Sequence, residues 1–296
     1  MISVIILTKN SAKELPRALL CLKQAVEFFA YELIVVDGMS SDETINIAKE
    51  MFPNAKILTE TKMGLSYARY MGFKASKGEY VAYVDSDICV PKDFFVRVLQ
   101  DFELDRKIGA VAAKFFPFPE YDRGALNRYY RSLKEEHLGQ EVSRFVLFFG
   151  TACTIIRRDV LERVKFDYRF KGAAEDKHIT RQITEMGFKL FFDSSICCEH
   201  IRPSTVWAEM KRYYQHGYYA PLYAKLHDDE TFRRQILGTA MYVASLVLPF
   251  LIPVLWIARL RSHREKKLAY GIVGYFLTLS RRIGTLIGCF RWRKLL

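Results

Sequence analysis

The sequence lacks the two glycine-rich signatures that most often mark nucleotide sites. Neither GxGxxG after a strand nor GxxxxGK[ST] occurs in the 296 residues. The first absence excludes the pattern of nicotinamide dehydrogenases, and the second excludes the P-loop NTPases. No internal repeat or low-complexity linker divides the chain.

Cysteine is scarce and irregularly placed. The six cysteines form no CxxC pair or regular framework: Cys21, Cys89, Cys153, Cys197, Cys198 and Cys289. This favours a reduced compartment. A secretory leader is not expected either, because the apolar run 2–7 is short and no basic segment precedes it.

Acidic residues are nearly missing from the C-terminal segment. Residues 231–296 contain twelve Lys or Arg and one acid, Glu265, so most of the formal net charge of +12 belongs to them. The first 230 residues are close to neutral, which argues against a nucleic-acid-binding surface on the folded domain. We therefore divide the chain into a catalytic domain, 1–230, and a membrane-associated segment, 231–296.

The C-terminal segment contains an uncharged apolar stretch, Gln235 to Ala258. As a helix it could cross about 30 Å of hydrocarbon, although a buried core helix is the alternative. Basic residues flank both ends, and Pro249 and Pro253 lie mid-segment, so a kinked transmembrane helix and a re-entrant hairpin both remain open. Residues 268–290 better suit an interfacial helix. These features predict attachment to the cell membrane with the catalytic domain on the cytoplasmic side.

The first hundred residues alternate between short apolar runs and amphipathic segments. Strands are expected at 3–7, 32–36, 55–58, 80–84 and 108–114, with helices at 15–29, 41–51 and 64–75 between the first four. This alternation predicts an α/β, Rossmann-like, mostly parallel sheet with helices on both faces. Residues 115–149 suggest an excursion over the active site, strand character returns at 145–156, and Glu175 and Asp176 begin another helix.

The strongest chemical motif is Asp85-Ser86-Asp87, which follows the apolar strand 80–84. Residues i and i+2 of an extended chain share a face, so the two carboxylates repel one another unless a cation lies beside them. Mg²⁺ typically takes one or two protein carboxylates and completes its shell with water and phosphates. The motif therefore predicts a metal–diphosphate site, whereas an isolated DxD would more often be a capped surface turn.

Polar residues also follow the first two predicted strands. Thr8 and Asn10 follow one and Asp37 ends the other, and ligands of open α/β sheets bind outside the carboxyl ends of the strands. Asp37 could accept a hydrogen bond from a base or ribose, and Arg69 could meet diphosphate charge. Singly, each would be a cap or a surface residue.

Together these motifs resemble family 2 of the inverting glycosyltransferases, which have the GT-A fold. The resemblance covers residues 2 to about 217 and rests on an ordered series: 3–10, 35–44, Gly64 with 68–69, 78–80, 85–87, 150–158, 166–167, 175–176 with Arg181 and Gly187, and His200. Tyr70 departs from the Asn that many relatives carry. The region after His200 lacks the Gln-x-x-Arg-Trp pattern of processive synthases, which favours single-sugar transfer.

The resemblance implies a role for each motif. A nucleotide-sugar site would contain Thr8, Asn10, Asp37, Arg69, Asp85 and Ser86. Asp87, with Asp85 and His200, would bind Mg²⁺ or Mn²⁺, and Asp176 would be the catalytic base. The donor would be a UDP- or GDP-sugar.

The acceptor is less defined by the sequence. The basic tail, the apolar stretch and the aromatic, arginine-bearing segment 123–134 favour a polyprenyl phosphate or lipid-linked glycan at the membrane, with a soluble acceptor still open. Two other functions fit the sequence less well. An aspartyl-phosphate phosphatase normally carries its Asp-x-Asp on the first strand, and a catalytically inactive docking protein would not need Asp87 and Asp176.

Overall fold

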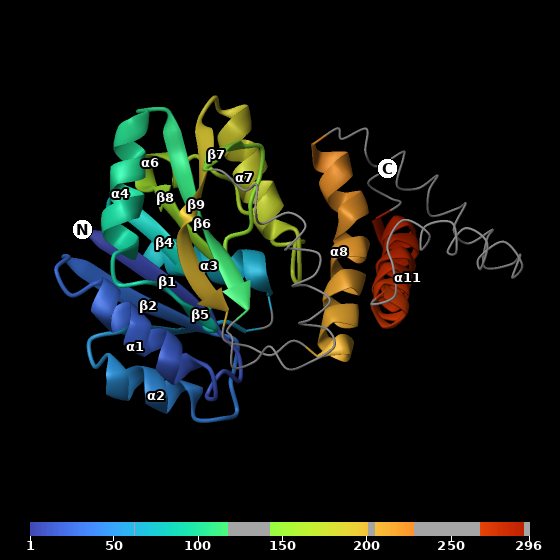
Figure 1. The fold of residues 1–296 in the computed structure, drawn as a ribbon, viewed down its shortest axis with the longest axis horizontal. Helices are drawn as coiled ribbons and strands as arrows, with labels where there is room; N and C mark the ends of the chain where they lie inside the picture. Colours follow the sequence, from blue (N-terminus) through green and yellow to red (C-terminus); the bar gives the residue numbers. More distant parts are fainter. Residues whose placement is uncertain (62, 118–142, 201–204, 228–266, 293–296) are drawn as a thin grey trace, which may run out of the picture. The chain divides into compact units, whose positions relative to one another are not determined.

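A computed structural model of the chain describes residues 1–61, 63–117, 143–200, 205–227 and 267–292 (Figure 1). The chain divides into two compact units. The first comprises Met1–Asp122, Glu136–Lys171 and Glu175–Pro203, and the second comprises Arg123–Glu135, Gly172–Ala174 and Ser204–Leu296.

The described part of the first unit is built on one nine-stranded sheet. Its order is β3-β2-β1-β4-β8-β6-β9-β5, and β7 pairs with β9. The strands are β1 (Ile2–Thr8), β2 (Tyr31–Asp37), β3 (Lys56–Thr59), β4 (Tyr80–Val84), β5 (Ile88–Cys89), β6 (Ile108–Pro117), β7 (Arg144–Val146), β8 (Cys153–Arg157) and β9 (Lys189–His200).

Half of this sheet matches the predicted parallel arrangement. Strands β3, β2, β1 and β4 are parallel neighbours, as expected for strands joined by crossover helices. Beyond β4 the sheet is mixed: β8 runs antiparallel to both β4 and β6, whereas β6 and β9 are parallel to each other. Strands β5 and β7 are also antiparallel to β9. Buried strands read as apolar runs whichever way they point, so composition did not reveal the direction.

Helices cover both faces of the sheet, as predicted. They are α1 (Leu15–Ala25), α2 (Thr44–Met51), α3 (Leu65–Ala75), α4 (Phe94–Leu104), α6 (Arg158–Leu161) and α7 (Glu175–Glu185). On one face Leu19 of α1 and Phe95 of α4 share a core cluster with Val35 of β2. On the other face Ala68 of α3 and Ile183 of α7 share one with strand residues that include Ile34, Val81 and Tyr83. Alternate strand residues therefore supply two separate cores.

The described part of the second unit includes two long helices, α8 (Val206–Leu226) and α11 (Lys267–Trp292). Glycines allow their backbones to meet: a Cβ added at Gly217 would collide with the carbonyl oxygen of Arg281, and one at Gly284 with that of Tyr214. The indole Nε1 of Trp292 donates a hydrogen bond to the Tyr218 carbonyl oxygen at 3.1 Å.

None of the described helices combines the length and apolar composition that crossing a membrane requires. The apolar stretch 235–258, the segment 123–134 and the proposed domain boundary at 230 lie outside the described residues, so these three expectations stay predictions. Residues 268–290 do form a helix, as expected, within α11.

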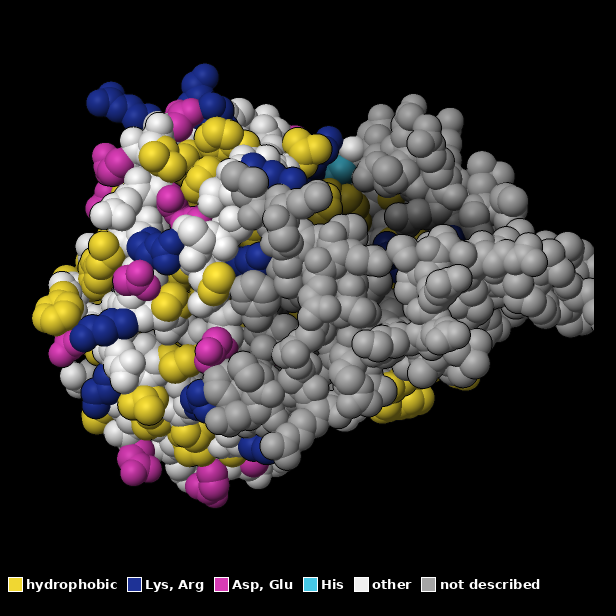
Figure 2. Space-filling model, viewed as in Figure 1, with side chains coloured by type: hydrophobic (Ala, Val, Ile, Leu, Met, Phe, Trp, Pro, Cys, Tyr) yellow, Lys and Arg dark blue, Asp and Glu magenta, His cyan; other side chains and the backbone are white. Residues whose placement is uncertain are grey.

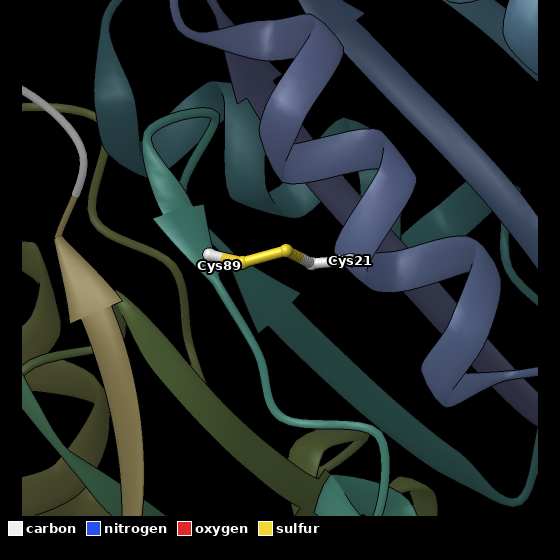
Figure 3. Close-up of a disulfide and its surroundings, with 2 residues drawn as sticks. All are labelled: Cys21 and Cys89. Atoms are coloured by element: carbon white, nitrogen blue, oxygen red, sulfur yellow. A yellow bond between two sulfur atoms is a disulfide. The ribbon is translucent and has the colours of Figure 1, made fainter.

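One pair of cysteines is oxidised, whereas their irregular spacing favoured reduced thiols. Cys21 on α1 and Cys89 on β5 form a disulfide, with their Cα atoms 5.4 Å apart and a sequence separation of 68 (Figure 3). The packing of α1 beside β5 brings the two together, and their spacing in sequence gives no sign of it. Cys153 and Cys198 remain thiols, with their Sγ atoms 3.2 Å apart.

Candidate active site at the carboxyl edge of the sheet

The first corner of the site lies where β1 and β2 end side by side. Thr8 is in register with Asp37, and its Oγ1 donates a hydrogen bond to Asp37 Oδ1 at 2.9 Å. The Ser40 backbone N–H donates to Asp37 Oδ2 at 2.8 Å, and the Ser40 hydroxyl donates to Oδ1 at 2.5 Å. Asp37 is buried, so these hydrogen bonds fix the direction of its carboxylate.

The loops after β1 and β2 are tied to each other. Asn10 has a left-handed backbone, with φ of 50°. Its N–H donates to Ser40 Oγ at 2.7 Å, and its Oδ1 accepts from the Ser41 N–H at 2.9 Å. Ser11 extends the network toward the Asp-x-Asp motif, since its hydroxyl lies 3.0 Å from that of Ser86. Predicted donor-site residues from three separate segments are thus brought together.

Arg69 lies at the centre of the site but is not an open surface cation. It is 5% exposed, its Nε and Nη2 donate to Glu175 Oε1 at 3.4 Å, and its Nη2 lies 4.0 Å from Asp85 Oδ1. Burial opposes its charge, but the Glu175 and Asp85 carboxylates raise the pKa of Arg69 overall. Arg69 therefore links the strand-end acid to the start of α7, and direct contact with a diphosphate stays a prediction.

The second acid of the motif pairs with a histidine. Asp87 Oδ2 lies 3.3 Å from His200 Nε2, because β5, which begins one residue after Asp87, pairs with the end of β9. Removal from water raises the pKa of Asp85, and the charge of Asp87 adds to this, while Arg69 opposes it. The structure therefore places Asp85, Asp87 and His200 in one neighbourhood.

This donor set suits a hard divalent cation that also binds substrate. Within the described ranges, no three His, Cys, Asp or Glu side chains are grouped closely enough to hold a metal by themselves. Two carboxylates and an imidazole fit Mg²⁺ or Mn²⁺ only if water and substrate phosphates complete the shell. That is the behaviour expected of a metal that arrives with a nucleoside diphosphate.

Asp176 and Glu175 are neighbours in the first turn of α7, but they differ in their exposure to solvent. Asp176 is partly exposed, and its Oδ1 accepts from the Lys177 N–H at 2.7 Å. Glu175 is buried, and burial together with the Asp176 charge raises the pKa of Glu175 to about 7, against the effect of Arg69. A Cβ at Gly150 would lie 3.3 Å from Asp176 Oδ2, so the segment before β8 lies against the proposed base.

Sequence reasoning missed the partners that orient these groups. Glu175, Ser40 and Ser11 carry the contacts that fix Arg69, Asp37 and Ser86. Glu175 had one signal, its place directly before Asp176. Its pairing with Arg69 spans 106 residues and could not be deduced from one sequence.

Comparison with known proteins identifies the family to which the chain belongs. The sequence profile described as "Glycosyl transferase family 2" matches residues 3–165. Glycosyltransferase AglE of Haloferax volcanii is 28% identical over 212 residues, which cover 68% of this chain and 67% of AglE. An uncharacterized glycosyltransferase of Haemophilus influenzae is 30% identical over 111 residues, 38% of this chain but only 37% of that protein.

Among solved structures, a mannosyltransferase from Pyrobaculum calidifontis in complex with GDP-Man and Mn²⁺ is similar in fold. The TM-score is 0.62 at 17% identity, and the match covers 96% of this chain and 86% of that one.

Proposed function

The chain belongs to glycosyl transferase family 2, and from this premise we propose that it transfers a single sugar from a nucleoside-diphosphate sugar to an acceptor, with inversion. The observation that carries the proposal is the ion-pair chain Asp85–Arg69–Glu175. It joins the acids at the strand ends to the first turn of α7, where Asp176 lies. Donor and acceptor groups would meet between these two elements.

The donor nucleotide would bind across the ends of β1, β2 and β4. Asp37, oriented by Thr8 and Ser40, offers carboxylate oxygens to the base or ribose, and Asn10 and Ser86 line the same edge. Asp87, Asp85 and His200 would hold Mg²⁺ or Mn²⁺ together with the diphosphate. When bound, this ion would offset the negative charge that builds on the leaving diphosphate.

Asp176 would accept the proton of the acceptor hydroxyl. As the proton leaves, the hydroxyl oxygen forms a bond to the anomeric carbon, and the bond from that carbon to the diphosphate breaks with its electron pair on the leaving oxygen. A carboxylate is a weak base toward a hydroxyl. Much of its contribution would be to orient the acceptor.

We further propose that the acceptor is carried on a membrane lipid, as a phosphate or as a lipid-linked glycan. Supporting this, α11 exposes an apolar row at helical spacing: Phe276, Ile283, Ile287 and Phe290. Exposed arginines, Arg281 and Arg291, lie on the same helix. An apolar row with cations suits the interface of an anionic membrane, which would be the cytoplasmic side of the cell membrane.

The second candidate is a docking protein with a glycosyltransferase fold and no activity. It would retain the apolar row of α11 but would have no need for the buried Arg69–Glu175 pair. A binding and turnover screen separates the two. UDP- and GDP-sugars are titrated with and without Mn²⁺ or Mg²⁺ against wild type, Asp87→Ala and Asp176→Asn.

The proposal expects metal-dependent donor binding that Asp87→Ala abolishes. Asp176→Asn should retain binding and lose at least a hundredfold in kcat, in the range for a lost general base. Asp159→Asn, an exposed surface acid, is the control and should match wild type. If no nucleotide sugar binds the folded protein under any metal condition, the docking function replaces this one.

A further inference from the structure

An exposed apolar strip lies beside the proposed base. Phe145, Leu147 and Phe148 are 51%, 73% and 54% exposed, whereas Phe149 belongs to the second core cluster and the partly buried Val146 packs against it. Water contact of three large apolar side chains in four residues is unfavourable, and such strips mark binding surfaces.

The exposed strip lies close to Asp176. Phe148 is two residues from Gly150, where an added Cβ would lie 3.3 Å from Asp176 Oδ2. The Lys177 ammonium group lies 4.8 Å from the centre of the Phe148 ring. Apolar surface, a cation and the base therefore follow one another along one short path.

The charge at this point favours an anion. Among the described residues no carboxylate lies within ion-pair distance of Lys177 Nζ, while the neighbouring Glu175 is paired with Arg69. Lys177 also lies in the first turn of α7, where the partial positive charge of the helix N-terminus adds to its own. A ligand that matches the path carries a hydroxyl near Asp176, an anionic group near Lys177 and an apolar chain over Leu147 and Phe148.

We propose that this strip binds the lipid chain of the acceptor and Lys177 its phosphate, and that the acceptor is a sugar joined through phosphate to a long apolar chain. The inference rests on the proposed function and names the acceptor class for the same site. The sugar hydroxyl gives its proton to Asp176, and the phosphate lies at Lys177 without reacting. Figure 2 shows Lys and Arg interspersed with Asp and Glu over the described surface that is visible in that view.

The test compares two acceptors that differ only in the chain, a farnesyl and a methyl ester of the same sugar phosphate, using a donor that supports turnover. For wild type the KM of the farnesyl acceptor should be at least tenfold lower. Leu147→Ser with Phe148→Ser should raise that KM at least tenfold and leave the KM of the methyl acceptor unchanged. Lys177→Gln should raise the KM of both acceptors.

The chain offers a matched control in Phe28, which is 82% exposed with Lys92 Nζ 5.8 Å from its ring centre. Phe28→Ser with Lys92→Gln should leave every constant unchanged. Thermal unfolding verifies that each variant folds. Equal KM values for the two acceptors in wild type, or a farnesyl KM that the strip variants do not change, would overturn the inference while turnover persists. Absence of any donor binding would instead refute the proposed function.

Discussion

At the scale of single residues, the site depends on buried charges that compensate one another. The Arg69 and Glu175 side chains are almost inaccessible to water, while Asp85, the second partner of Arg69, is partly exposed. Replacing one partner of such a buried set leaves the other uncompensated, which is more costly than the pair itself is stabilising.

Arg69→Met should therefore lower the free energy of unfolding by about 3–5 kcal/mol at pH 8, measured by urea denaturation. Adding Glu175→Gln should restore part of the loss, since it removes the isolated carboxylate. Arg157→Met breaks a partly exposed pair with Asp159 and should cost less than about 1 kcal/mol. An equal loss of unfolding free energy in Arg69→Met and Arg157→Met would contradict a buried, mutually compensating ion pair at Arg69.

A second buried acid, Asp101 on α4, should make stability depend on pH. Its Oδ2 is buried and has no hydrogen-bond partner in the described structure. Burial, followed by the charge of Asp193, raises the pKa of Asp101 to about 7. Because the folded state holds this proton more tightly than the unfolded state, stability is lost as the pH rises from about 4 through 7.

Asp101→Asn should remove that loss. The difference in unfolding midpoint between Asp101→Asn and wild type should be about 4–8 °C larger at pH 8.5 than at pH 5.5, which corresponds to about 2 kcal/mol. Glu103→Gln, an exposed change on the same helix, should show no such difference. Parallel pH profiles for wild type and Asp101→Asn would refute a raised pKa at this site.

At the scale of elements, the sequence predicted what neighbouring residues determine. The apolar runs before Asp37 and Asp85 and the helical spacing around Leu19 identified β2, β4 and α1. The sequence did not predict the reversed direction of β8 or the Cys21–Cys89 bond, because both depend on which distant segments pack together. For the same reason a local motif identified Asp176 as a candidate, whereas the contact between Glu175 and Arg69, which joins distant parts of the chain, was not predicted.

The disulfide ties α1 to β5, two residues beyond Asp87. Cys21→Ser should lower the free energy of unfolding by about 2–4 kcal/mol, and dithiothreitol should have the same effect on wild type. Exposed Cys197→Ser should change neither stability nor sensitivity to reductant. If reductant leaves the wild-type urea midpoint unchanged, the bond is not a structural element of the protein.

The packing of α8 against α11 should be sensitive to substitution of the glycines at the contact. Gly284→Leu places a side chain against the Tyr214 carbonyl oxygen, so the helices must separate. Backbone amides of α11 should then exchange with deuterium at least tenfold faster. Ile283→Ala, at the adjacent exposed position, is the control and should leave exchange unchanged; similar rates in the two variants would contradict close backbone contact.

At the scale of the whole molecule, donor and metal should stabilise the fold only together. The acids that would hold the metal need phosphate oxygens to complete its shell, so each ligand alone should bind weakly. With a nucleotide sugar and Mn²⁺ at about a hundred times the dissociation constant, the free energy of unfolding should rise by about 2.7 kcal/mol. This is a rise of about 5–10 °C in the midpoint, measured by calorimetry. The rise should be absent in Asp87→Ala and present in Asp159→Asn, and a full rise in Asp87→Ala would remove Asp87 from the metal site.

The glycine contact between α8 and α11 has a consequence for the medium in which the protein works. Most helix pairs of water-soluble proteins are held together because association removes apolar surface from water, a force that vanishes in hydrocarbon. Two backbones that fit directly against each other are held mainly by dispersion, which is available in either solvent. The pair should keep its geometry in aqueous buffer, in detergent and at a bilayer surface.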